Sequence, residues 1–372
     1  MDSERADSAR AFLAAAGWDG AKLSPLPGDA STRRYIRVTR NGHTAMLMDQ
    51  PQNAEAAPCP PSATPDERRA LGYNAVARLA GADCGRFIAA ARFLRARGLA
   101  APEIYAGDIT KGFVLLEDFG DDLYCDALGD GGAEDDLYGA AIDAIALLHA
   151  EPAPSQLMPE MSLHAYDQAA CLAETDLVTE WFVPLALGRR ARQDEVEEHR
   201  ALWRDALASL RGHAPVFVHR DYHAQNLFWL PARAGVARVG LIDFQDAVAG
   251  NRSYDLVSLL EDARRDVTPD LALAMKQRYA TTVRQRGQEL DGEAWAAEMA
   301  VTAAQRNAKI AGIFARLAKR DGKPRYLSYL PRVWGHLESD LEHSALANLR
   351  AWYDRTIPRE KRRAGVEEGV AA

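Results

Sequence analysis

Residues 216–261 read VFVHRDYHAQNLFWLPARAGVARVGLIDFQDAVAGNRSYDLVSLLE, and they hold the densest group of polar side chains suited to catalysis in the chain. His219, Asp221 and Asn226 fall within eight residues, directly after the apolar run 216–218. This apolar run predicts a buried strand, and the polar run after it predicts a loop. We therefore expect Asp221 and Asn226 to face one cleft from that loop.

A hairpin is predicted to follow the loop. Residues 227–242 read as two strands joined by a turn at 231–237, and the second strand carries Asp243 back beside Asn226. Phosphoryl transfer needs a carboxylate that orients and deprotonates a hydroxyl group, and oxygen ligands that hold Mg²⁺ on the phosphates. Asp221 is the candidate catalytic base, and Asn226 and Asp243 are the candidate metal ligands.

This arrangement resembles the catalytic loop and metal site of protein kinases, in which an aspartate, four residues and an asparagine precede a metal-binding aspartate. An isolated HRD, as at 219–221, is common by chance and reads as a salt-bridged loop. The complete set of loop, hairpin, apolar strand and Asp243 is much harder to reach by accident. The sequence therefore favours a kinase.

HRDYHAQN (219–226), IDFQDA (242–247) and YDLVSLL (254–260) resemble the aminoglycoside phosphotransferase family, a branch of the protein-kinase-like fold that acts on small molecules. The resemblance implies an α+β, two-lobed fold that uses ATP and Mg²⁺. A small β-rich N-lobe, residues 1–119, would bind the nucleotide, and a larger, mainly helical C-lobe, residues 120–372, would carry the catalytic loop, the metal site and the sugar-binding helices. His219 and Asp255 would be structural supports of the catalytic loop.

Composition limits the partners. A formal net charge of −8 gives no general attraction for nucleic acid or an anionic membrane, and 48% hydrophobic with 26% charged residues is typical of a globular chain.

The N-terminus, MDSERADSAR, is no secretory signal, and no apolar run is long enough to span a bilayer. Cys59, Cys84, Cys125 and Cys171 lack metal or disulfide spacing. We therefore expect a cytoplasmic monomer with free thiols and small-molecule partners.

The N-terminal part predicts a β-hairpin over 35–48 with an Asn-Gly turn at 41–42. The small residues just before it, 28–32, are expected to form a loop whose backbone N–H groups approach phosphate oxygens. Ser31 and Thr32 are the ATP contacts in this interpretation. An ordinary surface turn explains the same residues equally well.

The hairpin departs from the protein kinase pattern. Its second strand, AMLMD (45–49), lacks the lysine that binds phosphates, and the helix predicted over 85–97 has no acidic residue to orient such a lysine. Because the candidate base and metal ligands all remain, the loss suggests that another electrostatic device replaces this ion pair. Arg33 or Arg34 is the candidate replacement cation. Two solvated arginines on an edge strand are the alternative.

Two further strands are predicted over 104–106 and 113–116, and the second leads into Glu117-Asp118-Phe119-Gly120. The lobes are expected to join here, near residue 120. Main-chain groups near Glu117 and Phe119 are expected to pair with adenine.

The candidate substrate contacts come from three segments of the chain. Glu180 and Trp181 lie in a helix predicted to break near Pro184 (residues 172–188), and a carboxylate beside an aromatic ring commonly holds a sugar; a core Trp with a solvated Glu is the alternative. His223 and Gln225 flank the candidate base and either touch substrate or satisfy loop backbone groups. Lys309, in a long C-terminal helix followed by a basic turn, either meets an anionic substrate or belongs to a solvated face.

Residues 29–38, 46–51, 179–188 and 308–332 extend the resemblance to one branch of the family, the bacterial kinases that phosphorylate N-acetylmuramate and N-acetylglucosamine at the C1 hydroxyl in peptidoglycan recycling. The lysine-free strand is shared with that branch. Two alternatives stay open. A phosphotransferase for aminoglycosides or amino alcohols predicts acidic residues at the substrate end, which the basic segment 309–325 argues against. A regulatory pseudokinase is suggested by the missing lysine.

Overall fold

The computed structural model describes residues 3–27, 33–51, 59–60, 62–79, 83–129, 131, 133–159, 161–212 and 214–363. The chain forms two compact units. The sheet unit comprises Met1–Ala144, Pro154–His164 and Ala224–Ala247, and the helical unit comprises Ile145–Ala153, Ala165–His223 and Val248–Ala372. Residues 120–144 thus group with the sheet unit, and the lobe boundary near residue 120 stays a prediction.

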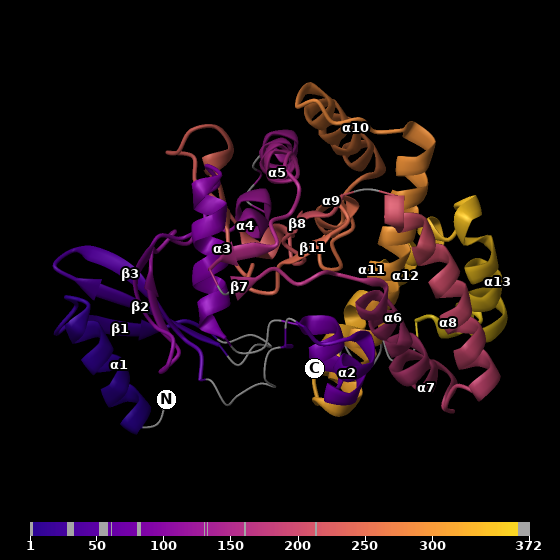
Figure 1. The fold of residues 1–372 in the computed structure, drawn as a ribbon, viewed down its shortest axis with the longest axis horizontal. Coiled ribbons are helices and arrows are strands. Elements are labelled where there is room, and N and C mark those ends of the chain that lie inside the picture. Colours follow the sequence, from indigo (N-terminus) through magenta and orange to yellow (C-terminus); the bar gives the residue numbers. More distant parts are fainter. Residues whose placement is uncertain are drawn as a thin grey trace. The chain divides into compact units, whose positions relative to one another are not determined.

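A five-stranded antiparallel sheet forms the centre of the sheet unit (Figure 1), with the strand order β1-β2-β3-β5-β4. Its strands are β1 (Lys22–Pro25), β2 (Arg34–Arg40), β3 (His43–Asp49), β4 (Ile104–Asp108) and β5 (Phe113–Leu116). The predicted hairpin is confirmed. Asn41 and Gly42 join β2 to β3 with φ values of 50° and 80°, the left-handed backbone that a tight two-residue turn requires.

Helix α1 (Ser3–Ala15) covers one face of this sheet. Phe12 of the helix stacks on Phe113 of β5, with ring centroids 5.6 Å apart, in a core that includes Leu47 of β3. Because side chains alternate along a strand, Met46 and Met48 face the opposite side of the sheet. That second face is the one available to a ligand.

Helices and two hairpins complete the sheet unit. They are α2 (Pro65–Leu71), a π-helical turn (Asn74–Arg78), α3 (Cys84–Ala96), α4 (Tyr124–Gly129), most of α5 (Glu134–Leu148), the pair β6 (Gln156–Met158) and β7 (Met161–Ser162), and the pair β9 (Leu227–Trp229) and β10 (Val239–Leu241). The predicted hairpin around residues 231–237 and the predicted helix over 85–97 are thereby confirmed. Phe87 of α3 stacks on Phe244, with ring centroids 4.8 Å apart, and so links α3 to the segment that follows β10.

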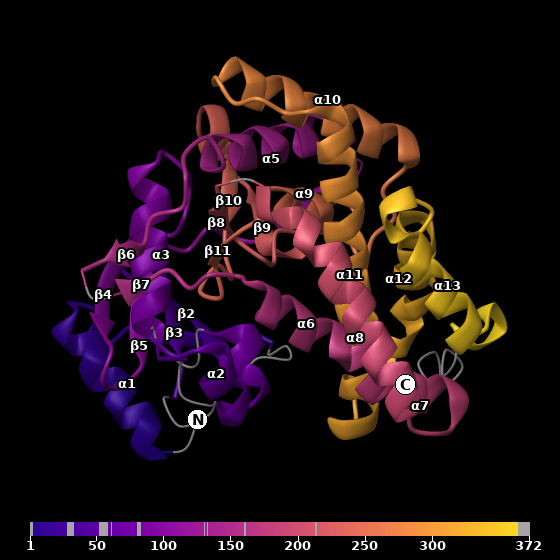
Figure 2. The ribbon, with the colours of Figure 1, turned by 45° about the vertical axis from the view of Figure 1, so that its right-hand side comes forward.

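The helical unit combines a two-stranded antiparallel ribbon with long helices (Figure 2). The ribbon pairs β8 (Val216–Val218) with β11 (Val248–Gly250), and the helices are α6 (Gln168–Leu177), α7 (Val183–Leu187), α8 (Gln193–Ala208), α9 (Ser253–Leu260), α10 (Pro269–Gln285), α11 (Gly292–Arg320), α12 (Leu330–Asp340) and α13 (Ala347–Thr356). The predicted buried strand before the catalytic loop is β8. The predicted long C-terminal helix is α11.

The helix break predicted near Pro184 lies elsewhere. Helix α6 ends at Leu177, a π-helical turn spans Val178–Phe182, and Pro184 sits in the first turn of α7. The first turn of a helix tolerates proline, because an N–H there has no partner within the helix. The irregularity therefore precedes the proline and falls on Glu180 and Trp181.

Helix α11 is the centre of the helical unit, and it packs against α6, α9 and α12. Small residues let neighbouring backbones approach it. A Cβ atom at Gly312 would lie 2.5 Å from the Cβ atom and 2.8 Å from the carbonyl oxygen of Leu177. The absence of a side chain at Gly312 thus sets the distance between α11 and the end of α6.

No helix in the described part of the chain is both long enough and apolar enough to cross a bilayer. All four cysteines are free thiols, as predicted; Cys59, Cys84 and Cys171 are buried, and Cys125 is half-buried.

We predict that Gly312→Ala lowers the free energy of unfolding by about 1–3 kcal/mol, because the added methyl group overlaps Leu177 and forces two helices apart. Gly335→Ala in α12 is the matched control, since no atom lies within 4 Å of its added Cβ atom. It should raise stability by about 0.5–1 kcal/mol through helix propensity. Urea unfolding measures both, and equal effects of the two substitutions would contradict the packing interpretation.

Candidate active site

The two candidate metal ligands lie at one end of the β9–β10 hairpin in the sheet unit. Asn226 ends a short turn directly before β9, and Asp243 is the second residue after β10. The main-chain N–H of Ile242 donates to the Asn226 carbonyl oxygen at 3.2 Å. The hairpin therefore brings the backbones of Asn226 and Asp243 together, as the sequence predicted.

Asp243 has a strained backbone. Its φ of 62° is in the left-handed region, which an aspartate adopts at a cost of about 1–3 kcal/mol and which clusters at functional sites. Its side chain is 34% exposed, and its Oδ1 atom lies 2.8 Å from Nη2 of Arg33. The side-chain amide of Gln245 donates to the same oxygen at 3.0 Å. The carboxylate is therefore held in place by a cation and an amide while it remains partly accessible.

The two candidate replacement cations have different partners. Arg33 is buried and binds Asp243, so the alternative of a solvated arginine fails for this residue. Arg34 instead binds the buried carboxylate of Asp49 at 2.8 Å, which Arg5 also binds at 2.7 Å. Ser31 and Thr32, the other predicted contacts of this segment, lie outside the described residues.

A largely apolar cavity of about 270 Å³ lies in the sheet unit, on the sheet face opposite α1. Residues from β2, β3, α3, β5, the segment after β5 and the β9–β10 hairpin line it: Leu26, Pro27, Tyr35, Arg37, Met46, Phe87, Pro102, Leu116, Glu117, Asp118, Phe119, Gly120, Asp121, Leu123, Gln225, Phe228 and Ile242. Met46 stands on the strand on which the protein kinase pattern has lysine. Gln225, predicted as a substrate contact, lines this cavity together with Glu117 and Phe119.

Glu117 and Phe119 lie where the sequence placed them, but their main-chain groups differ in availability. The N–H of Glu117 donates to the Glu103 carbonyl oxygen at 2.8 Å, and its carboxylate binds Arg233 at 2.5 Å. Among the described residues, no acceptor receives the N–H of Phe119. The N–H of Glu117 is thus excluded from pairing with a base, whereas the carbonyl group of Glu117 and the N–H of Phe119 are candidates.

Arg37 is a charged residue of this cavity that the sequence interpretation missed. It binds Asp118 at 2.7 Å and Asp121 at 2.7 Å, and its hydrogen bond holds the pKa of the Asp121 carboxyl below its ordinary value. The alternation of Tyr35, Arg37 and Thr39 along β2 was the available signal, since it places these three residues on one face.

The catalytic loop belongs to the helical unit and is fixed at its start. The main-chain N–H groups of His219 and Arg220 donate to the two oxygens of the buried Asp255 carboxylate at 2.8 and 3.0 Å. Arg220 has a φ of 75°, a second non-glycine residue in the left-handed region. The half-buried Asp221 follows directly. The support contact that the family resemblance implied for Asp255 is present.

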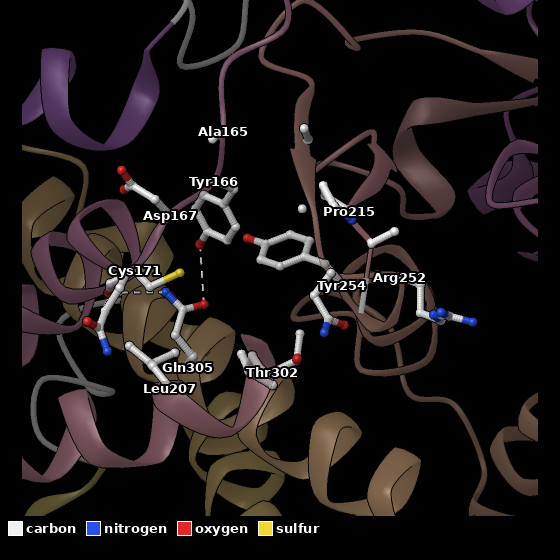
Figure 3. Close-up of a pocket in the computed structure, with 16 residues that line it drawn as sticks. Ala165, Tyr166, Asp167, Cys171, Leu207, Pro215, Arg252, Tyr254, Thr302 and Gln305 are labelled. Carbon is white, nitrogen blue, oxygen red and sulfur yellow. Dashed lines mark hydrogen bonds between the residues drawn. The ribbon is translucent and has the colours of Figure 1, made fainter. Parts of the chain in front are cut away.

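Glu174 was missed by the sequence interpretation, and it is the centre of a buried polar network behind the catalytic loop. Its Oε1 atom lies 2.7 Å from Nη2 of Arg220 and 3.0 Å from Nζ of Lys309. Its Oε2 atom accepts the amide of Gln305 at 3.0 Å and the hydroxyl of Tyr166. Figure 3 shows Tyr166 and Gln305 joined by a hydrogen bond at a cavity of about 420 Å³. No sequence pattern pairs residue 174 with residue 220.

Electrostatics explain why this carboxylate is charged although it is fully buried. Burial by itself would raise the pKa of the Glu174 carboxyl, but Lys309 and Arg220 outweigh burial and hold the pKa below its ordinary value. Lys309 also donates to the hydroxyl of Tyr254 at 3.0 Å. Lys309, predicted to meet an anionic substrate, is therefore bound to an internal carboxylate, and its role toward substrate stays a prediction.

Glu180 and Trp181 line a cavity of about 670 Å³ in the helical unit, together with Arg190, Arg200 and Lys319. Burial raises the pKa of the Glu180 carboxyl, with Arg316 and Arg200 opposing this shift. The carboxylate and the ring thus share one cavity, although Trp181 also packs against the core of the unit.

His223 is buried in the helical unit, and burial lowers its pKa to about 4. The imidazole is therefore neutral near pH 7 and offers one N–H donor and one acceptor.

The donor types at the hairpin fit Mg²⁺. This ion prefers oxygen ligands and is usually held by one or two carboxylates plus substrate phosphates. Asn226 and Asp243 supply one amide oxygen and one carboxylate at the same hairpin end. The described residues contain no group of three or more His, Cys, Asp or Glu side chains that could hold a metal ion.

This combination of an antiparallel sheet, a metal-ligand hairpin and a loop pinned by a buried aspartate is typical of kinase-like phosphotransferases. A family model for the phosphotransferase enzyme family matches residues 22–290, and the chain belongs to this family. The chain is 44% identical over 369 residues to the N-acetylmuramate/N-acetylglucosamine kinase of Caulobacter vibrioides, a match that covers 98% of this chain and 99% of that protein. The predicted family is therefore confirmed.

Solved structures confirm the predicted kinase-like fold. The microcompartment-associated aminopropanol kinase matches with a TM-score of 0.58 at 15% identity, covering 91% of this chain and 99% of that chain. The ADP-bound aminoglycoside phosphotransferase APH(2'')-Ib matches with a TM-score of 0.54 at 14% identity, covering 93% of this chain and 99% of that chain. At these identities the likeness concerns the fold alone.

We predict that Glu174→Gln lowers the free energy of unfolding by about 3–5 kcal/mol, because it removes the buried negative charge that both Arg220 and Lys309 contact. Glu180→Gln, on the following helical turn and partly exposed, is the control and should change stability by less than about 0.5 kcal/mol. Adding Lys309→Met to Glu174→Gln should restore part of the loss. Urea unfolding gives all three values, and a Glu174→Gln variant as stable as the control would refute the network.

Proposed function

We propose that this chain is an ATP-dependent sugar kinase that phosphorylates the anomeric C1 hydroxyl of N-acetylmuramate, N-acetylglucosamine or both. The single observation that carries the proposal is 44% identity to a kinase with those two sugars in its name, along nearly the whole of both chains. The fold and the candidate site are compatible with it. A cytoplasmic, monomeric enzyme without nucleic acid or membrane partners, acting in peptidoglycan recycling, is part of the same proposal.

ATP is proposed to bind in the sheet unit. The largely apolar cavity of about 270 Å³ suits adenine, with the Glu117 carbonyl group as acceptor and the Phe119 N–H as donor. Arg33 is the proposed substitute for the missing lysine, since it is buried and directed at the carboxylate that would hold the metal. Ser31 and Thr32 remain proposed phosphate contacts on sequence grounds.

Asn226 and Asp243 are the proposed ligands of Mg²⁺, because each supplies a side-chain oxygen atom and Mg²⁺ prefers oxygen ligands. When bound, the ion would neutralise charge on the phosphate oxygens. The strained backbone of Asp243 and the hold of Arg33 and Gln245 on its Oδ1 atom orient the carboxylate before nucleotide arrives. Such prior orientation avoids reorganisation during the reaction.

Asp221 is the proposed catalytic base. The anomeric oxygen would attack the γ-phosphorus atom, so that a C1–O–P bond forms, the bond from the γ-phosphorus to the β,γ-bridging oxygen breaks, and ADP leaves. The hydroxyl proton would pass to the Asp221 carboxylate. An anomeric hydroxyl is more acidic than an ordinary alcohol, so a weak base suffices. Asp255 holds the two N–H groups that precede Asp221, which fixes the path of the loop.

The sugar is proposed to contact the Glu180–Trp181 cavity and the neutral imidazole of His223. The cations that share this cavity, Arg190, Arg200 and Lys319, suit a sugar that bears negative charge. Lys309 and Gln225 are the remaining proposed substrate contacts; Lys309 binds Glu174, and Gln225 lines the cavity proposed for adenine.

Purified protein incubated with ATP, Mg²⁺ and a panel of free sugars, amino alcohols and aminoglycosides tests the function. We expect ADP release with N-acetylmuramate or N-acetylglucosamine and a sugar 1-phosphate product identified by ³¹P NMR. Phosphorylation of amino alcohols or aminoglycosides alone, or nucleotide binding without turnover of any compound, would replace the proposal by one of its two alternatives.

Asp221→Asn should reduce turnover by about 10²–10⁴-fold, because the amide cannot accept the hydroxyl proton. ADP affinity should stay within twofold of the wild type, since the proposed nucleotide contacts are elsewhere. Single-turnover kinetics and calorimetric ADP binding measure the two quantities. Normal turnover of this variant would show that Asp221 is not the base.

Arg33→Met should raise the KM for ATP roughly tenfold to hundredfold, because it removes a charge-assisted contact at the phosphates. Arg34→Met is the matched control on the next residue, and its KM should stay within twofold because Arg34 binds Asp49. Steady-state kinetics at saturating sugar give both values. A larger effect at Arg34 than at Arg33 would reverse the assignment.

A further inference from the structure

Arg86 is a buried arginine without an ionic partner among the described residues. It is the third residue of α3 and is 5% exposed. Its Nε atom has no hydrogen-bond partner, and its Nη1 atom lies 3.9 Å from the Sδ atom of Met161, a weak acceptor. Arg220, equally buried, instead binds Glu174 at 2.7 Å. An uncompensated buried charge is costly, so its presence calls for an explanation.

The carboxylates near Arg86 are engaged with other groups. Asp246 lies 3.4 Å from Nη2 of Arg78, and Asp83 accepts the N–H of Gly85 at 2.7 Å. Burial is the largest influence on Arg86 and lowers its pKa, with Asp246 and Asp83 opposing this shift from a distance. Neither carboxylate therefore neutralises Arg86 by direct contact.

Arg86 also has basic neighbours. Burial, followed by the charges of Arg86 and Arg68, lowers the pKa of His164 to about 4. His164 and Arg68 are 8% and 6% exposed. These three residues, termed the Arg86 cluster, place two guanidinium groups and a neutral imidazole together.

The Arg86 cluster belongs to the same compact unit as the proposed nucleotide site, and Arg86 precedes a residue of that site in the chain. Phe87, the next residue of α3, lines the cavity of about 270 Å³ and stacks on Phe244, which directly follows Asp243. The protein kinase pattern has an acidic residue on this helix to orient a lysine. Here the helix carries an unpaired cation instead, so the sign of the charge is reversed.

We propose that Arg86 is an oxyanion-binding residue, whose guanidinium fork takes a phosphate or carboxylate group of a bound ligand while His164 offers a further N–H donor. A planar guanidinium matches the two oxygens of either group. The identity of the ligand rests on the proposed function, which offers two sources: a phosphate of ATP, and the carboxylate of N-acetylmuramate, a group that N-acetylglucosamine lacks.

The first test is thermal unfolding of the full chain with and without 10 mM inorganic phosphate or 1 mM ADP as probes. Arg86→Met should raise the melting temperature without ligand, because it removes an uncompensated buried charge, and should lose the stabilisation that the effective probe gives the wild type. Arg92→Met, exposed on the same helix, should behave like the wild type. A lower melting temperature for Arg86→Met would overturn the proposal by showing a structural role.

The second test distinguishes the two sources by calorimetric binding of ADP, N-acetylmuramate and N-acetylglucosamine. Arg86→Met should weaken one oxyanion ligand by about tenfold to hundredfold, and Arg86→Lys should weaken it less. If Arg86→Met loses affinity for ADP, the group that Arg86 binds is a phosphate of the nucleotide. Loss of N-acetylmuramate affinity alone, with N-acetylglucosamine unchanged, identifies a carboxylate. Affinities within twofold of the wild type for all three ligands would overturn the proposal.

These outcomes are independent of sugar turnover. If neither sugar is phosphorylated or bound, the proposed function fails, while the phosphate and ADP measurements still decide whether Arg86 binds an oxyanion. If both sugars are phosphorylated and Arg86→Met binds every ligand normally, the proposed function stands and the inference about Arg86 fails. An Arg86→Met variant that does not fold counts as a lower melting temperature and likewise overturns the proposal.

Discussion

The buried carboxylate of Asp255 fixes the backbone from which the candidate base projects. It accepts the N–H groups of His219 and Arg220, and it lies 3.4 Å from Nε2 of the buried His149. The two main-chain N–H groups would otherwise be buried polar groups without a partner, which is costly. The loop leaves β8, turns at Arg220 in the left-handed conformation and then carries Asp221. The Asp255 carboxylate holds the backbone at this turn.

A second carboxylate fixes the side chain of the same arginine. Glu174 binds Arg220 from within the helical unit, and Lys309, Gln305 and Tyr166 surround it. Together Asp255 and Glu174 restrain Arg220 at its backbone and its guanidinium. The strain of the left-handed conformation is thus balanced by one buried hydrogen bond to the backbone and one buried ion pair.

In the sheet unit, electrostatics are rearranged relative to the protein kinase pattern. The lysine strand carries Met46, the acidic helix carries Arg86, and Arg33 binds Asp243. In the protein kinase pattern the positive charge is on a strand in the middle of the sheet. Here the positive charges are on Arg33, the residue before β2, and on Arg86 in helix α3. Asp243 and Asn226 are retained beside these changes, as the proposed function requires.

Much of the architecture follows from short-range pattern. The alternation and the Asn-Gly turn predicted β2 and β3, and the apolar runs around residues 231–237 predicted the hairpin that brings Asn226 and Asp243 together. Family resemblance added the role of Asp255. The predicted break at Pro184 was wrong by a few residues, because proline is tolerated in a first helical turn and the π-helical turn before it has no sequence signature.

By itself the sequence determined the kinase-like fold, the family and the identities of the candidate base and metal ligands, because these depend on residue types at fixed local spacing. Only the tertiary structure decided which of two adjacent arginines turns toward Asp243, that Glu174 binds Arg220, and that the buried Arg86 has no counter-ion in the part of the chain that the structure describes. Those facts depend on contacts between residues more than 40 positions apart, or on the absence of such contacts. The residues that surround a side chain in space leave no local signal in the chain.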